Sequence, residues 1–499
     1  MRKRRLLYNT ISSVVFQMTA IICGFILPRL ILIYYGSEVN GLVNSITQFI
    51  KFISFLELGV GAVVQSALYK PLADKDNNAI SGVVVSAQRF FSMLAKIMLG
   101  YVIVLIAIYP FIANQDFGWI YTSTLIIAIS ISSFAQYYFG IVNLLLLTAD
   151  QKGYIQYLIH TGTLILNTVA CVILMRMGQG IHVVKLTTSL IFLLRPFLMK
   201  LYVDRHYNIN RHITYTEEPI KQKWNGVAQH VSAIVLDNTD TVVLTLFSTL
   251  TNVSIYSVYH LIVYGVKNIF SIITNGVQSL LGELWAKQEL VELKSFLGWT
   301  EWTIHTGVTY AFGCTLVLIC PFVSVYTKGI DDANYIVPLF AGVITIANAV
   351  HGLRMPYISM IFAGDKYKET QNNFIISAAI NLVVSIVTVT MWGLVGVAIG
   401  TLVAMAYQTV WMAWYVSRNL VKWPFKNFIK QLCVDIFTWI LGYFASCWIV
   451  LEDTTYSSWI IMAIKVVAIW LAIIIVINIV FYPVYMKRLI KKVNHKSGI

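Results

Sequence analysis

Charged residues are scarce in this sequence. Asp, Glu, Lys and Arg together make up 12% of its 499 residues, whereas soluble domains carry roughly 25%. Hydrophobic residues reach 58%, and the mean hydropathy is +0.74. So few charges could not cover the core of a soluble protein, but the hydrocarbon of a bilayer removes the need for a polar surface. The composition therefore excludes an ordinary soluble enzyme and indicates an integral membrane protein.

Several catalytic motifs are also missing. The sequence has no GxxxxGK[ST] phosphate loop, no HExxH and no GxSxG, which excludes ATP hydrolysis by a phosphate loop and the common hydrolase chemistries. It also lacks a sizeable outer loop of the kind on which membrane glycosyl polymerases display acidic residues. We therefore expect no enzyme activity, no catalytic residue and no cofactor.

Paired cysteines and metal-binding clusters are absent as well. The six cysteines all lie in apolar stretches, and no CxxC pair or Cys/His cluster with metal spacing occurs. We interpret them as small buried hydrophobic residues and predict no structural disulfide and no metal site. The formal net charge of +14 is interpreted as the topological signal of cytoplasmic loops rather than as a nucleic-acid surface, so no nucleic-acid partner is expected.

Long apolar stretches fill the rest of the chain. About 20 such residues span a bilayer, and this criterion predicts fourteen transmembrane helices. The expected ranges are 10–33, 41–68, 86–111, 119–147, 154–177, 181–201, 224–248, 253–281, 301–327, 335–362, 370–391, 394–416, 430–450 and 457–485. The divisions within 154–201 and 370–416 depend on tight glycine-containing turns, so twelve helices is the alternative count.

The loops orient these helices. With the N-terminus inside, most of the 36 Lys and Arg residues fall on inner segments such as MRKRR, 202–223 and the tail KRLIKKVNHK, whereas the outer loops hold Arg176 and Lys328. The positive-inside rule predicts this asymmetry. We therefore expect a multi-pass membrane protein with both termini in the cytoplasm and only short outer loops, such as YYGSEVN.

The same map predicts the domain organisation. Residues 1–201 form an N-terminal six-helix bundle, residues 202–223 a cytoplasmic linker and residues 224–416 a second six-helix bundle. Residues 417–499 add two helices and a basic cytoplasmic tail.

A few charged residues lie deep within the predicted helices. A charge at the bilayer centre costs at least about 2.5–3.5 kcal/mol on insertion scales, so it usually faces a cavity or a partner. The basic residues selected in this way as candidates for binding an anionic substrate are Lys51, Lys96, Lys267 and Arg354. Arg29 lies nearer the outer end of its helix, and it is a further candidate because it follows Pro28, which would kink the helix. The acidic candidates, which either form structural ion pairs or couple transport to an ion, are Glu57, Asp237 and Asp240.

Two segments of the sequence resemble a known family. FLELGVGAVVQSALYKPLADKD (55–76) is similar to the second-helix signature of Wzx-type oligosaccharide flippases, and DNTDTVVLTLFSTLTNVSIYSVYHLI (237–262) is similar to their seventh-to-eighth helix segment. These proteins belong to the multidrug/oligosaccharidyl-lipid/polysaccharide transporter superfamily. The resemblance implies two six-helix bundles in a V arrangement, with a cationic cavity lined by the first, second, seventh and eighth helices.

The resemblance also implies a substrate. It is a polyprenyl-diphosphate-linked oligosaccharide, moved from the inner to the outer leaflet by alternating access for capsule, exopolysaccharide or wall-polymer assembly. Expected partners are this substrate, membrane lipids, a polysaccharide polymerase and glycosyltransferases. With no ATP site, coupling to H⁺ or Na⁺ is an open possibility. The alternatives are a cation-coupled multidrug antiporter and a peptidoglycan-precursor (lipid II) flippase of the same superfamily.

Overall fold

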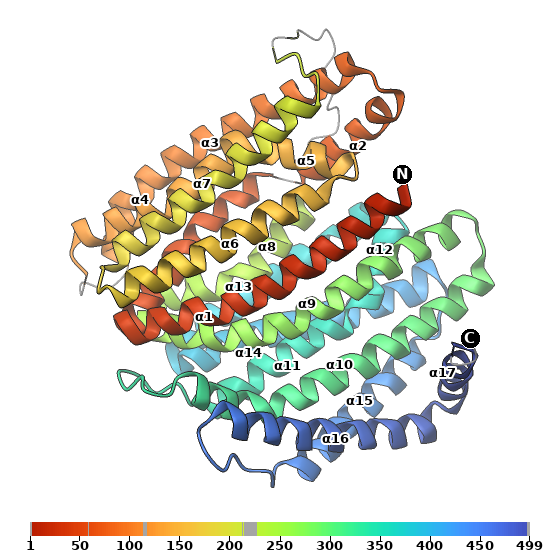
Figure 1. Ribbon diagram of the computed structural model, residues 1–499. Helices are drawn as coiled ribbons and strands as arrows, with labels where there is room; N and C mark the ends of the chain where they lie inside the picture. Colours follow the sequence, from red (N-terminus) through yellow and green to blue (C-terminus); the bar gives the residue numbers. More distant parts are fainter. Residues whose placement is uncertain (1, 58, 113–116, 212, 214–226, 497–499) are drawn as a thin grey trace. The chain divides into compact units, whose positions relative to one another are not determined.

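The computed structural model describes residues 2–57, 59–112, 117–211, 213 and 227–496, and within these ranges the chain is helical with no strand (Figure 1). Ten helical segments of this part are long and apolar enough to cross a membrane. The predicted all-α integral membrane fold is therefore confirmed. The ten segments are Leu7–Phe55, Asn77–Ile112, Trp119–Ala149, Gly153–Arg176, Ile181–His206, Leu290–Tyr326, Tyr367–Trp392, Leu394–Leu420, Phe425–Ser446 and Tyr456–Phe481.

The chain divides into two compact units, of which the first contains the residues up to Ile234 together with Thr249–Ser254. Within this unit α6 packs against α1 and α7, while α4 packs against α3 and α7. Its complete elements are α1 (Arg2–Lys51), η1 (Phe52–Glu57), α2 (Val60–Asp74), α3 (Asn77–Ile112), α4 (Trp119–Ala135), the π-helical turn η2 (Gln136–Gly140), α5 (Ile141–Ala149), α6 (Gly153–Arg176) and α7 (Ile181–His206).

The predicted outer loop YYGSEVN contains a division between two helices. α1 consists of two helices that meet at a kink at Gly36, so the predicted division between 10–33 and 41–68 is present and the connection is shorter than predicted. Gly36 has φ 82° and ψ 176°, a backbone conformation that residues with a Cβ rarely adopt. One glycine is therefore enough to join two consecutive apolar segments, and the polar residues around it do not require a loop.

The second unit contains Val235–Ser248 and the chain from Ile255 onward. Within it α14 packs against α11 and α13, and α10 packs against α11, α15 and α16. Its elements are α8 (Val227–Phe247, which begins in the first unit), α9 (Leu250–Ala286), α10 (Leu290–Tyr326), α11 (Pro338–Leu353), α12 (Met355–Ala363), α13 (Tyr367–Trp392), α14 (Leu394–Tyr415), the π-helical turn η3 (Val416–Leu420), α15 (Phe425–Ser446), α16 (Tyr456–Phe481) and α17 (Pro483–Lys496).

Both divisions that left the helix count open between fourteen and twelve are real helix boundaries. α6 ends at Arg176 and α7 begins at Ile181. α13 ends at Trp392 and α14 begins at Leu394, because Gly393, with φ 53°, reverses the chain between them. The predicted linker 202–223 is described only in part: α7 continues through His206, and residues 212 and 214–223 lie outside the described residues.

The helices of the second unit pack around large buried aromatic residues. Trp470 of α16 is fully buried among Cys314, Leu318, Met462 and Val466. Many apolar side chains elsewhere, including Ile103 and Ile464, are by contrast more than half exposed. Such a surface fits the hydrocarbon of a bilayer, in which exposed apolar side chains carry no penalty.

Candidate functional site

The second unit holds a buried carboxylate with several hydrogen-bond donors. Asp240 of α8 is 5% exposed. Its Oδ2 accepts a hydrogen bond from the Tyr256 hydroxyl of α9 at 2.9 Å. The Thr401 hydroxyl of α14 lies 2.9 Å from Oδ1 and 2.8 Å from Oδ2. Three helices therefore fix both oxygens of this acid.

A further hydrogen bond connects Thr401 to α13. The Asn381 side-chain amide of α13 donates to the Thr401 hydroxyl at 3.0 Å, so a polar chain runs from α13 through α14 to Asp240. These apolar helices carry few polar groups, and a buried polar group that lacks a partner costs about 1–3 kcal/mol. These hydrogen bonds therefore fix the position of Asp240.

Three stacked rings on α9 extend from the partner of Asp240 to the buried cation Lys267. Tyr256 stacks on His260 at 5.4 Å between ring centroids, and His260 stacks on Tyr264 at 5.5 Å. Lys267 follows, with its ammonium 5.3 Å from the centre of the Tyr264 ring. Because residues three or four apart share a face of a helix, one face of α9 carries the partner of Asp240, a histidine and the ammonium of Lys267.

Lys267 and Arg354 are the two deeply buried cations among the predicted substrate-binding residues. They are 8% and 7% exposed. Arg354, at the break between α11 and α12, has its Nη2 2.7 Å from Nε2 of His351. A guanidinium can only donate, so Nε2 of His351 accepts and the ring is neutral in this arrangement. This contact holds Arg354 beside the other polar residues of the unit.

A small cavity joins these side chains. Its lining includes Asp240, Tyr256, His260, Lys267, His351 and Thr401. It holds about 20 Å³, which is room for about one water molecule. The described side chains bring one acid and one cation to the same cavity, with the second cation attached through His351. This arrangement can bind a small cation at the acid or an anionic group at the basic residues.

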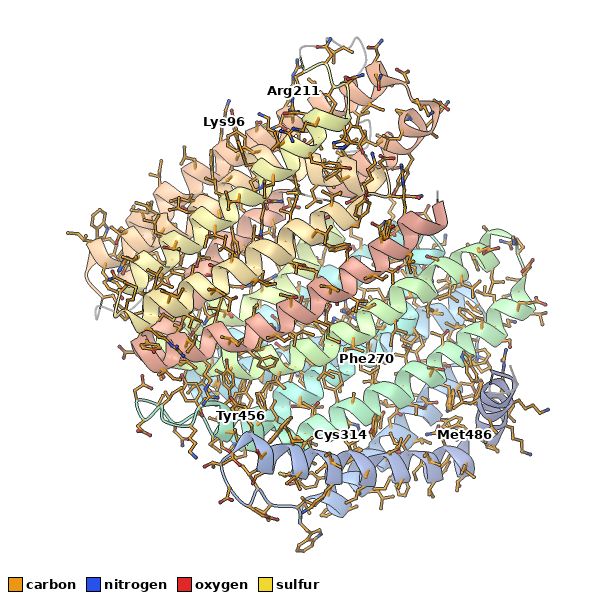
Figure 2. The ribbon with its side chains drawn as sticks, in the orientation of Figure 1. Lys96, Arg211, Phe270, Cys314, Tyr456 and Met486 are labelled. Atoms are coloured by element: carbon orange, nitrogen blue, oxygen red, sulfur yellow. The ribbon has the colours of Figure 1, made fainter. Side chains whose placement is uncertain are left out.

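Four of the predicted site residues belong to the first unit. Arg29 in α1 and Glu57 in η1 are half-buried, and Glu57 accepts a hydrogen bond of 2.5 Å from the Tyr137 hydroxyl. Lys51, at the end of α1, and Lys96 of α3 are exposed, and Figure 2 shows Lys96 pointing outward from its helix. The structure therefore brings Glu57 into a hydrogen bond with a neighbouring helix but leaves Lys51 and Lys96 at the surface of this unit.

Asp237 and the neighbours of Asp240 complete the comparison with the sequence. Asp237 lies on α8, three residues before Asp240, but its side chain is outside the described residues. Thr401, Tyr256 and His351 were not predicted from the sequence, because hydroxyls and a lone histidine are common in apolar helices. A histidine spaced three residues before a deep arginine, as in HGLR, was the one local signal available.

Comparisons with known proteins show which fold these helices build. No protein-family model and no curated protein sequence matches the chain. A solved structure described as lipid II flippase MurJ in an inward closed conformation matches with a TM-score of 0.74 and 14% identity, over 96% of this chain and 99% of that chain. The described helices therefore build a fold similar to that of this solved structure.

Multidrug transporters have a similar fold. An inward-facing multidrug resistance MATE family transporter of the MOP superfamily matches with a TM-score of 0.62 and 12% identity, over 82% of this chain and 98% of that chain. The Vibrio cholerae MATE transporter VcmN in its bent form matches with a TM-score of 0.54 and 15% identity, over 84% and 95%. At these identities the likeness shows the fold that these transporter structures share, and it does not show the substrate.

Proposed function

We propose that the protein is a flippase that moves a polyprenyl-diphosphate-linked oligosaccharide from the inner to the outer leaflet of a bacterial cytoplasmic membrane. The observation that carries the proposal is the pair of buried cations, Lys267 and Arg354. They occur in a chain whose fold is similar to that of a lipid II flippase over 96% of its length. Both termini are proposed to be cytoplasmic. The product would supply a polymerase that assembles capsule, exopolysaccharide or wall polymer.

The electrostatics of the second unit support an anionic substrate. Taking a charge out of water costs several kcal/mol, so a buried cation is retained where it meets an anion or a polar partner. A diphosphate cannot cross hydrocarbon without similar compensation. Charge-assisted hydrogen bonds from Lys267 and Arg354 can replace part of its hydration while the polyprenyl tail stays in the bilayer. Arg29, Lys51 and Lys96 remain candidate contacts along the path of the substrate.

The buried acid suggests the source of energy. Asp240 accepts hydrogen bonds from α9 and α14, and binding of H⁺ or Na⁺ at its carboxylate would change the charge of this buried cluster. We propose that such a cation, moving down its gradient, drives the alternating access of the transporter. Asp237, on the same helix, and Glu57, in the first unit, are the further candidate ion-coupling residues.

A multidrug antiporter is the second candidate function, since MATE transporters share the fold. A site for cationic drugs needs carboxylates as its main charged groups. Among the described residues of the Asp240 cluster, one acid stands beside two buried cations, which favours an anionic substrate. A lipid II flippase would share these cations and differs from the main proposal only in the sugar of its substrate.

Reconstitution in vesicles tests the function directly. The purified protein is placed in liposomes that contain a fluorescent polyprenyl-diphosphate oligosaccharide, and the fraction of lipid accessible to an external reagent is followed with and without an ion gradient. We expect translocation of the lipid-linked oligosaccharide to depend on the ion gradient. Added polyprenyl-diphosphate should inhibit it by competition. Ethidium efflux without translocation of the lipid would instead establish the antiporter, and preference for a peptidoglycan precursor would establish the lipid II flippase.

A further inference from the structure

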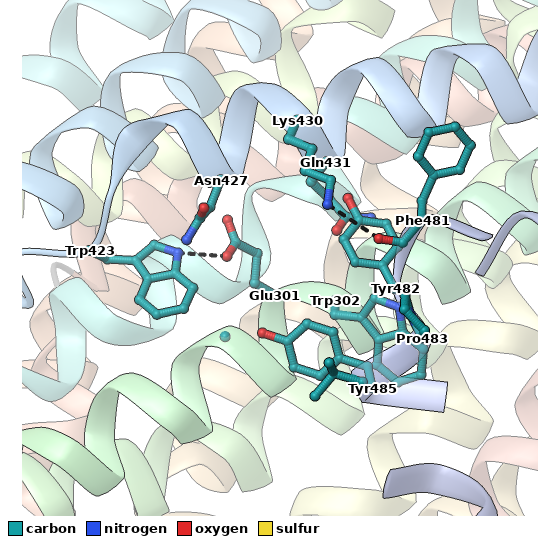
Figure 3. Close-up of a pocket in the computed structure, with 12 residues that line it drawn as sticks. Glu301, Trp302, Trp423, Asn427, Lys430, Gln431, Phe481, Tyr482, Pro483 and Tyr485 are labelled. Atoms are coloured by element: carbon teal, nitrogen blue, oxygen red, sulfur yellow. Dashed lines mark hydrogen bonds between the residues drawn. The ribbon is translucent and has the colours of Figure 1, made fainter. Parts of the chain in front are cut away.

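A second, larger cavity lies in the same unit, where α10, α15, α16 and α17 come together. Figure 3 shows residues that line this cavity. Its volume is about 210 Å³. Aromatic rings form much of its wall, and Glu301 of α10 supplies a carboxylate. The aromatic residues of the lining are Trp302, Trp423, Phe481, Tyr482 and Tyr485. The Asp240 cluster does not use any of these side chains.

Glu301 carries a buried charge that its immediate partners do not neutralise. Its side chain is 4% exposed. Oε1 accepts a hydrogen bond from the Tyr357 hydroxyl at 2.6 Å, and Oε2 accepts one from the Trp423 indole at 2.8 Å. Both donors are neutral, and within the described ranges no Lys or Arg forms an ion pair with Glu301.

A second buried acid, Asp435, adds to the number of carboxylates beside the cavity. Asp435 of α15 accepts a bond from the Thr309 hydroxyl at 2.9 Å, and its Oδ2 is 2.7 Å from Nδ1 of His305. Nε2 of His305 lies 3.2 Å from the Tyr357 hydroxyl, so a polar chain runs from Asp435 to Glu301. His305 can supply at most one positive charge to two carboxylates. The side of the network that borders the cavity, at Glu301, is therefore the place where a cation is favourable.

The Tyr482 hydroxyl is a second, independent indication that this cavity binds a ligand. This residue stands at the break between α16 and α17, is 9% exposed, and its hydroxyl has no hydrogen-bond partner among the residues described. Burial, followed by the charges of Asp435 and Glu301, raises the pKa of Tyr482, so the hydroxyl is neutral near pH 7. A buried hydroxyl without a partner costs about 1–3 kcal/mol, and a ligand in the cavity can remove that cost.

The wall of the cavity depends on a glycine. A Cβ on Gly298 would lie 2.7 Å from Cη2 of Trp423 and 2.9 Å from the Tyr485 hydroxyl, so only glycine lets both rings close on α10. Trp302 stacks on Tyr485 at 5.4 Å with an angle of 12° between the rings. Packed aromatic faces beside a carboxylate are the chemistry that recognises an organic ammonium group.

The surroundings of the cavity are basic and near the membrane surface. Lys430 lines the cavity, is exposed, donates to the Phe481 carbonyl at 3.2 Å and lies over the Tyr482 ring. The loop before α15 and the amphipathic helix α17 carry further lysines and arginines, and the positive-inside rule assigns both to the cytoplasmic side. A phosphate is therefore favoured at the rim, and an ammonium group inside.

We propose that this cavity binds the headgroup of a zwitterionic aminophospholipid of the inner leaflet, with its ammonium group between the aromatic rings and Glu301 and its phosphate at Lys430. The carboxylate of Glu301 in the interior would face the ammonium group of a phosphoethanolamine headgroup, and the ammonium of Lys430 at the rim would face its phosphate. The proposal does not depend on the substrate that the protein transports.

Binding in lipid nanodiscs tests the proposal. Native mass spectrometry of the protein would compare retention of phosphatidylethanolamine with retention of phosphatidylglycerol and of N-acetylated phosphatidylethanolamine. Hydrogen bonds to charged groups are worth about 1.5–3 kcal/mol, so we expect roughly a tenfold or greater preference for phosphatidylethanolamine, lost on N-acetylation. Equal retention of all three lipids would overturn the proposal. Tighter binding of soluble ethanolamine phosphate than of the lipid would also overturn it, in favour of a soluble ligand.

Three variants locate the bound lipid. Glu301→Gln should remove the preference about tenfold, whereas Glu292→Gln, an exposed position on the same helix, should leave it unchanged. Tyr482→Phe removes only the partnerless hydroxyl, and Gly298→Ala displaces the two rings. Both should fold and should weaken retention several-fold. If Tyr482→Phe and Gly298→Ala, each with the thermal midpoint of the wild type, retain phosphatidylethanolamine as the wild type does, the lipid binds elsewhere and the proposal is wrong.

Discussion

The hydroxyl of Thr401 lies within 2.9 Å of both carboxylate oxygens of Asp240. The two residues are on α14 and α8, 161 positions apart in the chain. A hydroxyl has one proton, so Thr401 donates to one of the two oxygens at a time, while the Tyr256 hydroxyl donates to Oδ2. The contact joins α14 to α8, so a change in the packing of these two helices would change the environment of the acid.

Asp240→Asn should change the ion dependence of transport. The amide keeps the shape of the side chain and can still accept from Tyr256 or Thr401, but it binds neither H⁺ nor Na⁺ as a carboxylate does. We expect translocation in vesicles to lose its response to the ion gradient, by tenfold or more in rate if the gradient is the driving force. The matched control is Asp331→Asn, at an exposed loop position. An unchanged ion dependence in Asp240→Asn would make the acid structural.

Lys267→Ala should abolish export. Under the proposed function Lys267 contacts the diphosphate of the substrate, and loss of that contact costs about 1.5–3 kcal/mol of binding, equivalent to at least tenfold weaker binding. In cells, surface polysaccharide should disappear while lipid-linked repeat units accumulate in the inner leaflet, at normal levels of the protein. The same change at Lys51 tests the first unit. Lys287→Ala, whose side chain is 56% exposed, is the control. Normal polymer in both Lys267→Ala and Lys51→Ala would contradict the assignment of the substrate site.

Trp470→Ala should destabilise the second unit. The ring is fully buried, packs against the positions of Gly313 and Gly442, and its indole donates to the Ser446 hydroxyl at 3.1 Å. Replacing such a residue leaves a cavity that costs about 3–5 kcal/mol. The thermal midpoint in detergent should fall by several degrees. Trp448→Ala, at an 81% exposed position, should leave it nearly unchanged. Equal midpoints for the two variants would show that α10, α15 and α16 do not depend on this contact.

Tyr207 should make stability depend on alkaline pH. Its hydroxyl donates to Asp150 at 2.6 Å, and burial, followed by this hydrogen bond, raises the pKa of Tyr207 above its usual value near 10. A raised folded-state pKa of an acid means that its contribution to stability is complete below about pH 10 and is lost as pH rises above that value. Tyr207→Phe should therefore be about 1 kcal/mol less stable than the wild type at pH 7.

The difference between Tyr207→Phe and the wild type should shrink above pH 10. Thermal unfolding in detergent between pH 7 and pH 11 measures it, and Tyr456→Phe, at an exposed position, serves as the matched tyrosine control. A stability difference that stays constant over this range would show that the hydrogen bond to Asp150 does not couple to the titration of the tyrosine.

Local sequence was sufficient for the helices but not for all of their boundaries. Runs of apolar residues predict membrane helices because the backbone in hydrocarbon must satisfy its own hydrogen bonds. The glycine turn at Gly393 was predicted correctly as a helix division. The division at YYGSEVN was also predicted, but the connection is a kink at Gly36 between two helices, and the residues beside it are helical. In both cases one glycine with a positive φ makes the connection, and the local pattern did not show that a single residue is enough.

The sequence also did not show which of the charges deep in the helices are buried in the fold. Depth along a helix selected Lys51, Lys96 and Lys267 alike, yet Lys267 is buried while the other two are exposed. A helix that is apolar on all sides has no face that the sequence marks as inner or outer. Glu301 and Asp435 were overlooked, although Glu301 and His305 stand four residues apart in a largely apolar helix, a spacing that places them on one face.

The sequence by itself determined that the chain is a helical membrane protein, where most helices lie and which charges are deep. These properties follow from the cost of exposing polar groups to hydrocarbon, which each segment meets on its own. Only the tertiary structure decided that Thr401 meets Asp240 and that Tyr357 joins Glu301 to His305. Those contacts join residues from 52 to 161 positions apart, and they depend on which faces of the helices pack together.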